Sequence, residues 1–160
     1  MTPAWFLQHA VRPALALLPA EMTSPAAAAM VIAICHQETR LHHRHQVGGP
    51  ARGFAQFEFR GMQGVLAHPR SKQAAGAVMT ALEYRTTPYG LHIALEHNDV
   101  LMAAFARLLL WTSALPLPSE SDSEGGWQLY LDAWRPGKPR PETWDDAFTV
   151  GWTAVREGMR

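Results

Sequence analysis

Apolar side chains recur at helical spacing along most of this chain. In its last third, one face of a predicted helix carries apolar residues at positions i, i+3, i+4 and i+7, namely Trp127, Tyr130, Leu131 and Trp134. Pro13 lies inside the first apolar stretch and is expected to kink or split that helix. Helices are predicted over residues 3–18, 25–38, 62–67, 71–83, 100–113 and 127–134, with a last helix from about residue 143.

The helix over residues 25–38 has the clearest start signal. Ser24 is a suitable N-cap and Pro25 fits the first helical position. Every residue from 26 to 35 is apolar, so this helix is expected inside the core, where its alanines allow neighbouring helices to approach closely. At about 1.5 Å per residue this helix spans about 20 Å, which places Glu38 at the C-terminal end of a buried helix.

Cap residues also mark the starts of three other predicted helices. Ser71 is expected to cap the helix over residues 71–83, and either Asn98 or Asp99 the helix over residues 100–113. Thr143 with Asp146 resembles a capping box in which aspartate replaces glutamate, and it marks the start of the last helix.

Residues 41–61 are expected to be irregular and to hold the only β-structure. Between residues 53 and 61 polar and apolar side chains alternate, which places Gln56 and Glu58 on one face of a short strand or hairpin arm. The predicted fold class is therefore mainly α, a single helical domain over residues 1–160 with at most a short β-hairpin near residues 53–60.

Composition agrees with a folded domain and excludes some kinds of site. The chain has 160 residues, of which 48% are hydrophobic and 18% charged, so it is long enough for one domain with a sizeable core. Its one cysteine, Cys35, excludes an intramolecular disulfide and a cysteine-based zinc site. The apolar neighbours of Cys35 predict a buried side chain.

Charge is balanced, with 14 Lys+Arg against 14 Asp+Glu, so the chain lacks the basic excess of many nucleic-acid-binding proteins. Residues 1–85 carry 8 basic and 4 acidic side chains, and residues 86–160 carry 6 and 10. Two interpretations stay open: solvated faces that happen to differ, or a mildly basic groove that faces an acidic polymer.

No segment has the pattern of a secretory signal or a membrane span. The apolar N-terminal stretch follows no basic region and is interrupted by Arg12 and Pro13, and residues 100–111 are too few to cross a bilayer. We therefore expect synthesis in the cytoplasm without a signal peptide, and no membrane insertion.

Glu38 is the main candidate for a catalytic side chain. Burial beside apolar residues and a position near a helix C-terminus both disfavour its charged form, which raises its pKa. A carboxylic acid still protonated near neutral pH can give a proton to a leaving oxygen. The alternative is a solvated helix-end residue, or one paired with Arg40 or Arg44.

Two short motifs resemble the catalytic core of the lysozyme-like superfamily. The Ala-rich helix ends in Gln-Glu-Thr at residues 37–39, and Gly-Phe-Ala-Gln follows at residues 53–56 after a glycine-containing turn. Over about residues 24–60 the chain resembles the soluble lytic transglycosylases and goose-type lysozymes, including their phage relatives, and a weaker likeness continues over residues 127–139. This resemblance implies a lysozyme-like helical fold with Glu38 as general acid, Thr39 in place of the usual serine, and Gln56 in the sugar cleft.

Further polar side chains are candidates for binding the sugar. Gln56 can both donate hydrogen bonds to an N-acetyl group and accept them from it. Three roles stay open for Glu58, which are a second catalytic carboxylate, a substrate ligand, or a partner of Arg52 or Arg60. The predicted substrate-binding residues are Gln56, Glu58, Arg52, Gln46, Tyr89 and Tyr130.

Histidines flank Glu38 on both sides, at positions His36, His42, His43 and His45. Because no His-Glu-x-x-His spacing is present, we expect a solvated or sugar-contacting loop rather than a metal site. No cofactor is expected. A protonated histidine near Glu38 would lower the pKa of that carboxyl group.

The resemblance implies an enzyme, a muramidase or lytic transglycosylase that cleaves the β-1,4 bond between N-acetylmuramic acid and N-acetylglucosamine in peptidoglycan. It would act at the cell wall or in a phage particle, with the glycan strand and phage particle components as candidate partners. One alternative is a non-catalytic phage or secretion structural protein that keeps a lysozyme-like fold. Another is a helical binding module whose motif match is accidental.

Overall fold

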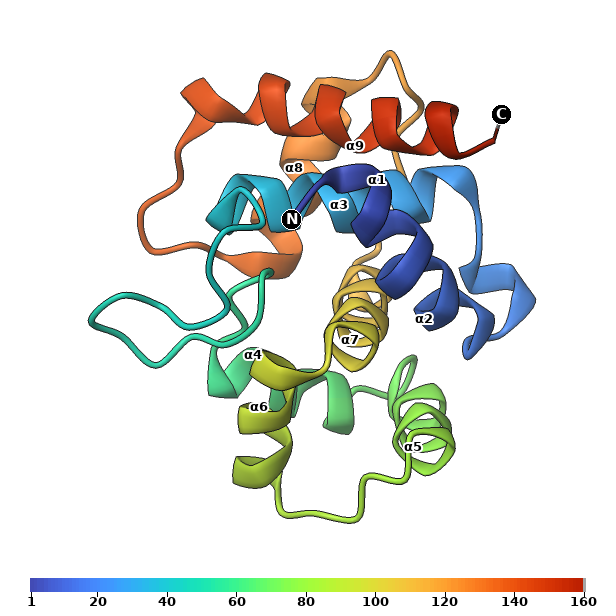
Figure 1. Ribbon diagram of the computed structural model, residues 1–160, viewed down its shortest axis with the longest axis vertical. Helices are drawn as coiled ribbons and strands as arrows, with labels where there is room; N and C mark the ends of the chain where they lie inside the picture. The colour runs from blue at the N-terminus through green and yellow to red at the C-terminus, as the bar shows by residue number, and fades with distance from the viewer. Residues whose placement is uncertain (160) are drawn as a thin grey trace.

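The computed structural model describes residues 1–159, and its chain is mainly helical, which confirms the predicted all-α character (Figure 1). The α-helices are α1 (Pro3–Phe6), α2 (Arg12–Ala16), α3 (Pro25–Thr39), α4 (Phe59–Ala67), α5 (Lys72–Ala81), α6 (Pro88–His97), α7 (Asp99–Thr112), α8 (Ser123–Trp134) and α9 (Trp144–Gly158). Short helical turns of other types are the π-helical η1 (Leu7–Val11) and the 3₁₀-helical η2 (Ala20–Met22) and η3 (Pro141–Thr143).

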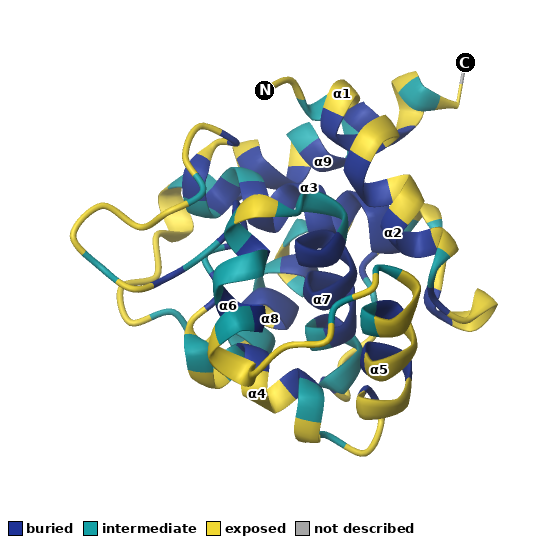
Figure 2. Cartoon of the chain, turned by 60° about the horizontal axis from the view of Figure 1, so that its bottom comes forward, coloured by how far each residue is buried: buried dark blue, intermediate teal, exposed yellow. Residues whose placement is uncertain are grey.

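Helix α3 runs through the centre of the fold, as its uninterrupted apolar sequence predicts. The Ser24 hydroxyl accepts a hydrogen bond of 3.0 Å from the backbone N–H of Ala27, and Pro25 occupies the first helical position. Residues 27–35 are all buried, among them Cys35. Helices α3 and α7 are dark with buried residues in Figure 2, whereas the surrounding loops are largely exposed.

Helix α9 packs along α3, and small residues set how closely the two approach. Gly151 of α9 meets the backbone at Ala29 and Ala33 of α3, and an added Cβ would overlap the carbonyl oxygen of Ala29. The close approach expected from the alanines of α3 is therefore present, and Figure 1 shows the two helices running side by side. The buried face of α9 is the one the sequence predicts, with Trp144, Phe148, Gly151 and Val155.

Pro13 divides the first helical stretch, as expected. A π-helical turn over Leu7–Val11 joins α1 to α2 just before this proline. Proline has no N–H to donate to the carbonyl four residues earlier, and its ring crowds that carbonyl, so the helix widens there. The helical part ends at Ala16, two residues earlier than predicted.

Helix α6 was not expected from the sequence, although a start signal is present. The Thr87 hydroxyl accepts from the N–H of Gly90 at 3.1 Å, and Pro88 stands in the first turn. Asn98 ends α6 and caps α7, because its side-chain oxygen accepts from the N–H of Leu101 at 3.0 Å. Asn98, rather than Asp99, is thus the cap of the helix predicted over residues 100–113.

Ser71 and Thr143 occupy the N-cap positions of α5 and α9, as expected, but neither side chain makes a capping hydrogen bond. The Ser71 hydroxyl donates to the carbonyl of Val65 at 2.7 Å instead of capping α5. Thr143 makes no capping bond to α9, and its hydroxyl contacts the side-chain oxygen of Gln37 at 2.9 Å and the carbonyl of Arg140 at 3.1 Å. Both hydroxyls bind groups from a preceding segment, which the local sequence pattern does not reveal.

The predicted strand over residues 53–60 does not form. Residues 53–56 make a turn, closed by two backbone hydrogen bonds of 2.8 and 3.0 Å between Arg52 and Phe57, and α4 begins directly after Glu58. In the described part of the chain, β-structure is limited to isolated antiparallel bridges, His45 with Arg52 and Arg52 with Phe57. The expected alternation therefore does not place Gln56 and Glu58 on one strand face.

The buried apolar side chains of α1, α3, α7 and α9 belong to one core cluster. No helix within residues 1–159 is both long and apolar enough to cross a membrane.

Candidate functional site

An open cavity of about 730 Å³ lies beyond the end of α3, a volume typical of small-molecule sites. Its walls come from the loop of residues 41–58, from α8, and from the connection over residues 135–143. Figure 1 shows this loop and this connection on the same side of the fold. Of the predicted site residues, the cavity brings together Glu38, Gln46, Gln56, Glu58 and Tyr130.

Glu38 stands at the C-terminal end of α3, where the sequence predicted it, and is half-buried. The helix ends because Arg40 and Leu41 adopt left-handed backbone conformations, with φ of 52° and 57°. Glu38 does not pair with Arg44, which instead donates two hydrogen bonds of 2.8 and 2.7 Å to Asp99. The carboxyl group is thus left without an arginine within 4.0 Å in the described part of the chain.

Tyr130 of α8 donates a hydrogen bond of 2.6 Å to Oε1 of Glu38. Burial raises the pKa of Glu38, and this effect exceeds the lowering by the Tyr130 hydrogen bond and by the charge of Arg140. The nearby charge of Glu58 also raises the pKa of Glu38. Glu38 therefore keeps its proton to a higher pH than an ordinary glutamic acid, and with Oε1 occupied by Tyr130, the proton belongs on Oε2.

Thr39 connects the two motifs that carry the family resemblance. Its buried hydroxyl lies 3.0 Å from the carbonyl oxygen of Phe54 and 3.1 Å from that of Cys35. The residue after Glu38 thus fastens the end of α3 to the turn of residues 53–56. Thr39 therefore links the end of α3 that carries Glu38 to the turn that carries Gln56, and both of these side chains line the cavity.

Gln56 ends that turn and lines the cavity in a left-handed conformation with φ of 49°. Its side-chain amide nitrogen donates to the carbonyl of Gly53 at 2.8 Å, which holds the side chain in place. Gly53 itself has φ of 72°, and a Cβ there would come within 2.7 Å of the Leu95 carbonyl oxygen. The close approach of α6 therefore requires glycine at position 53, and the turn presents Gln56 to the cavity.

Glu58 is exposed, lines the same cavity as Glu38, and occupies the N-cap position of α4. Within residues 1–159 it has no basic side chain within 4.0 Å, so neither Arg52 nor Arg60 is its partner. The proposed ion pair is thus the one role of Glu58 that the geometry does not support. A catalytic role and a substrate-binding role both stay open.

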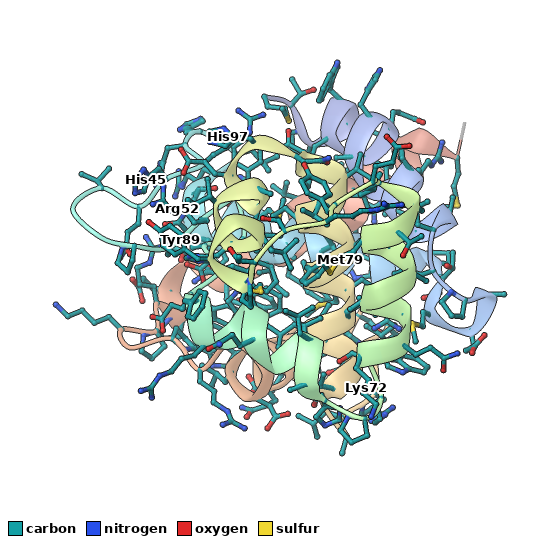
Figure 3. The ribbon with its side chains drawn as sticks, turned by 90° about the horizontal axis from the view of Figure 1, so that it is seen from below. His45, Arg52, Lys72, Met79, Tyr89 and His97 are labelled. Carbon is teal, nitrogen blue, oxygen red and sulfur yellow. The ribbon has the colours of Figure 1, made fainter. Side chains whose placement is uncertain are left out.

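Arg52 and Tyr89 are the predicted site residues that do not line the cavity. Arg52 forms an ion pair with Glu96 of α6 and contacts Nδ1 of His45 at 3.0 Å, so it fastens the loop to α6. Tyr89 is 65% exposed on α6. Figure 3 shows His45, Arg52 and Tyr89 on the same side of the molecule.

Gln46 has a supporting role in the cavity wall. Its backbone N–H donates to the carbonyl of Ala51 at 3.0 Å, and its side-chain oxygen accepts from the N–H of Ala51 at 3.2 Å. These bonds close the tip of the loop, residues 46–51. Gln46 therefore shapes the loop and also faces the cavity.

Several residues that line the cavity are not among the predicted site residues. Trp134 donates from Nε1 to the carbonyl of Ala55 at 2.8 Å and packs beside Phe57, with ring centroids 5.6 Å apart. Lys138 and Arg140 come from the proline-rich connection. The weak likeness over residues 127–139 was the available signal for this wall, but it did not single out Trp134 or either cation.

The histidines do not gather around Glu38. His36 lies 4.0 Å from Asp146, and His45 lies 3.7 Å from Glu96. His43 lines the cavity. Among the described residues, no three histidine, cysteine or acidic side chains are grouped as metal ligands would be.

Comparison with family models, with curated proteins and with solved structures found no match to this chain.

Proposed function

We propose that this protein is a lysozyme-like, peptidoglycan-cleaving glycosidase that acts on the β-1,4 bond between N-acetylmuramic acid and N-acetylglucosamine. The observation that carries the proposal is the position of Glu38, a half-buried carboxyl group of raised pKa in the wall of a cavity of about 730 Å³. A group of this kind is suited to general acid catalysis near neutral pH.

Glu38 would act first as an acid and then as a base. Its proton on Oε2 passes to the bridging oxygen of the glycan, the bond from that oxygen to C1 of N-acetylmuramic acid breaks, and N-acetylglucosamine leaves as an alcohol. The Glu38 carboxylate then accepts a proton from the oxygen that attacks C1. Tyr130 stabilises this carboxylate, because its hydroxyl already donates to Oε1.

The attacking oxygen decides the product. In a muramidase it belongs to water, whereas in a lytic transglycosylase it is the 6-hydroxyl of the same N-acetylmuramic acid, which gives a 1,6-anhydro ring. The second reaction needs one carboxyl group only, as the resemblance implies. Glu58 would then assist binding or help to keep the pKa of Glu38 high.

The remaining walls of the cavity suit a sugar. The half-buried Trp134 provides apolar ring surface, and the cavity is also lined by the polar side chains of Gln46 and Gln56. The Gln56 side chain is held by Gly53 through its amide nitrogen, which leaves the amide oxygen to accept from an N-acetyl N–H or a hydroxyl of the sugar.

The proposal is tested by digesting purified peptidoglycan with the purified protein and analysing the released fragments by mass spectrometry. Muropeptides with a 1,6-anhydro end would indicate a lytic transglycosylase, and fragments with a reducing end a muramidase. Absence of both products contradicts the proposal and favours the alternative, a non-catalytic phage or secretion protein of related fold. In either case the expected place of action is the cell wall or a phage particle.

A further inference from the structure

The cavity has walls of opposite charge. Glu38 and Glu58 line one part of it, whereas Lys138 and Arg140 line another, from the connection between α8 and α9. The charge of Arg140 lowers the pKa of Glu38, so the two walls are close enough to interact electrostatically. We refer to Lys138 and Arg140 together as the cationic wall.

The cationic wall is fixed to α3 beside the candidate catalytic residue. Gln37, which precedes Glu38 and is 4% exposed, donates from its side chain to the carbonyl of Arg140 at 2.9 Å. The Arg140 guanidinium donates back to the carbonyl of Gln37 at 2.6 Å, and Thr143 donates to the Gln37 side-chain oxygen at 2.9 Å. Adjacent residues of α3 thus present the carboxyl group and hold the cationic wall.

Neither cation of this wall forms an ion pair in the described part of the chain. Within residues 1–159, neither Lys138 nor Arg140 has a carboxylate within 4.0 Å. The arginines of the neighbouring loop differ, because Arg44 pairs with Asp99 and Arg52 with Glu96. The loop arginines are therefore structural, whereas the cations of the connection remain able to bind an anion in the cavity.

Neutral sugars do not need a cation for recognition. Side-chain amides can form hydrogen bonds with their hydroxyl and N-acetyl groups, and aromatic rings can pack against their apolar faces. We propose that Lys138 and Arg140 bind a carboxylate of the substrate, so that the cavity selects acidic glycan strands over neutral ones. This inference rests on the proposed function and names a specificity element of the same site. Two sources of the carboxylate are the lactyl group of peptide-free N-acetylmuramic acid and the stem peptide of intact peptidoglycan.

Lys138 gives the cleaner test, because its side chain is exposed and makes no hydrogen bond within residues 1–159, whereas Arg140 also supports the connection. The matched control is Lys72→Gln, which changes an exposed lysine at the start of α5, well away from the loop that carries His45 in Figure 3. Each change is made in a Glu38→Gln background so that bound glycan is not cleaved.

Binding is measured by calorimetry for three ligands, which are a chitin oligosaccharide, a peptide-free oligomer of N-acetylglucosamine and N-acetylmuramic acid, and the same oligomer with stem peptides. We expect Lys138→Gln to raise the Kd for at least one acidic ligand about tenfold and to leave the chitin Kd unchanged, since hydrogen bonds to charged groups are comparatively strong. The ligand that responds identifies the source of the carboxylate. Added salt should weaken only the binding that Lys138 provides.

Equal affinity of Lys138→Gln and Lys72→Gln for every acidic ligand would overturn this inference. So would an equal loss for chitin and for the acidic ligands, because Lys138 would then act on the cavity as a whole. The proposed function fails separately, if Lys138→Gln weakens the binding of acidic glycan in the Glu38→Gln background but the wild-type protein releases no fragments.

Discussion

The hydroxyl of Tyr130 donates a hydrogen bond of 2.6 Å to Oε1 of Glu38, although 92 residues separate the two in sequence. This bond joins α8 to the end of α3 and fixes one carboxyl oxygen in the cavity wall. It favours the carboxylate, whereas burial favours the neutral acid and prevails. The pKa of Glu38 is therefore the outcome of opposing effects, which substitution can separate.

Tyr130→Phe removes the hydrogen bond that lowers the pKa of Glu38, so that pKa should rise further. A general acid loses activity as it deprotonates, and the alkaline limb of the kcat/KM profile should therefore move to higher pH. The check is a pH–rate profile of glycan cleavage. Tyr89→Phe, at an exposed tyrosine outside the cavity lining, should leave the profile unchanged. An alkaline limb that stays in place in Tyr130→Phe would show that this bond does not control the acid.

Glu58→Gln tests whether a second carboxyl group takes part in the reaction. If Glu58 were a nucleophile or the base that activates water, the rate should fall as far as in Glu38→Gln. We expect a smaller loss with unchanged products, because Glu58 is exposed and the resemblance implies a single catalytic carboxyl group. Rate and muropeptide products are measured together. A loss equal to that of Glu38→Gln would contradict the single-acid mechanism.

The sequence was sufficient to predict the centre of the fold. Ser24, Pro25 and the apolar run after them define α3, and the helix period then places Glu38 at its end. These are local properties of a continuous segment. The motif at residues 53–56 was recognised through the family resemblance, but its turn was not predicted, because the alternation of side chains suggested a strand there. The left-handed conformation of Gln56 and the start of α4 after Glu58 interrupt that strand.

Contacts between distant segments were beyond sequence reasoning. Gln37 and Arg140 form two hydrogen bonds with each other, although 103 residues separate them in sequence. No periodicity in either segment indicates this pair. The same holds for Arg52, which was expected in the cleft but pairs with Glu96 on α6, a helix the sequence analysis did not predict. Because α6 was not predicted, Glu96 was not considered as a partner for Arg52.

The packing of α9 on α3 predicts a large difference between two Gly→Ala substitutions. At Gly151 the added methyl group would overlap the backbone of Ala29, and we expect a loss of about 1–3 kcal/mol in the free energy of unfolding. At Gly76, on the exposed face of α5, an added Cβ would meet no atom within 4 Å apart from the adjoining helix backbone. Alanine there should stabilise the protein by about 0.5–1 kcal/mol. Denaturant unfolding of both variants is the measurement. A Gly151→Ala variant as stable as Gly76→Ala would contradict the described packing.

Glu38 should also affect how stability depends on pH. Its pKa in the folded protein lies above its value in the unfolded chain, so folding favours the protonated form. The contribution of Glu38 to the free energy of unfolding is fully present at low pH. It declines as the pH rises from the pKa of the unfolded chain through the pKa of the folded protein. The Tm of Glu38→Gln should therefore match the wild-type Tm at about pH 4 and equal or exceed it near pH 7. A wild-type Tm clearly above that of the variant at pH 7 would mean that the fold stabilises the carboxylate.

The central claim, that Glu38 is the general acid of a glycan-cleaving enzyme, is tested most directly by the rate at which Glu38→Gln releases soluble fragments from peptidoglycan. Glutamine keeps the shape of the side chain and can accept the Tyr130 hydrogen bond, but it has no acidic proton to give. The matched control is Glu21→Gln, at an exposed glutamate of η2 outside the cavity. We predict that Glu38→Gln falls about 10²–10⁴-fold below this control at pH 7. A rate for Glu38→Gln equal to that of the control would contradict the assignment.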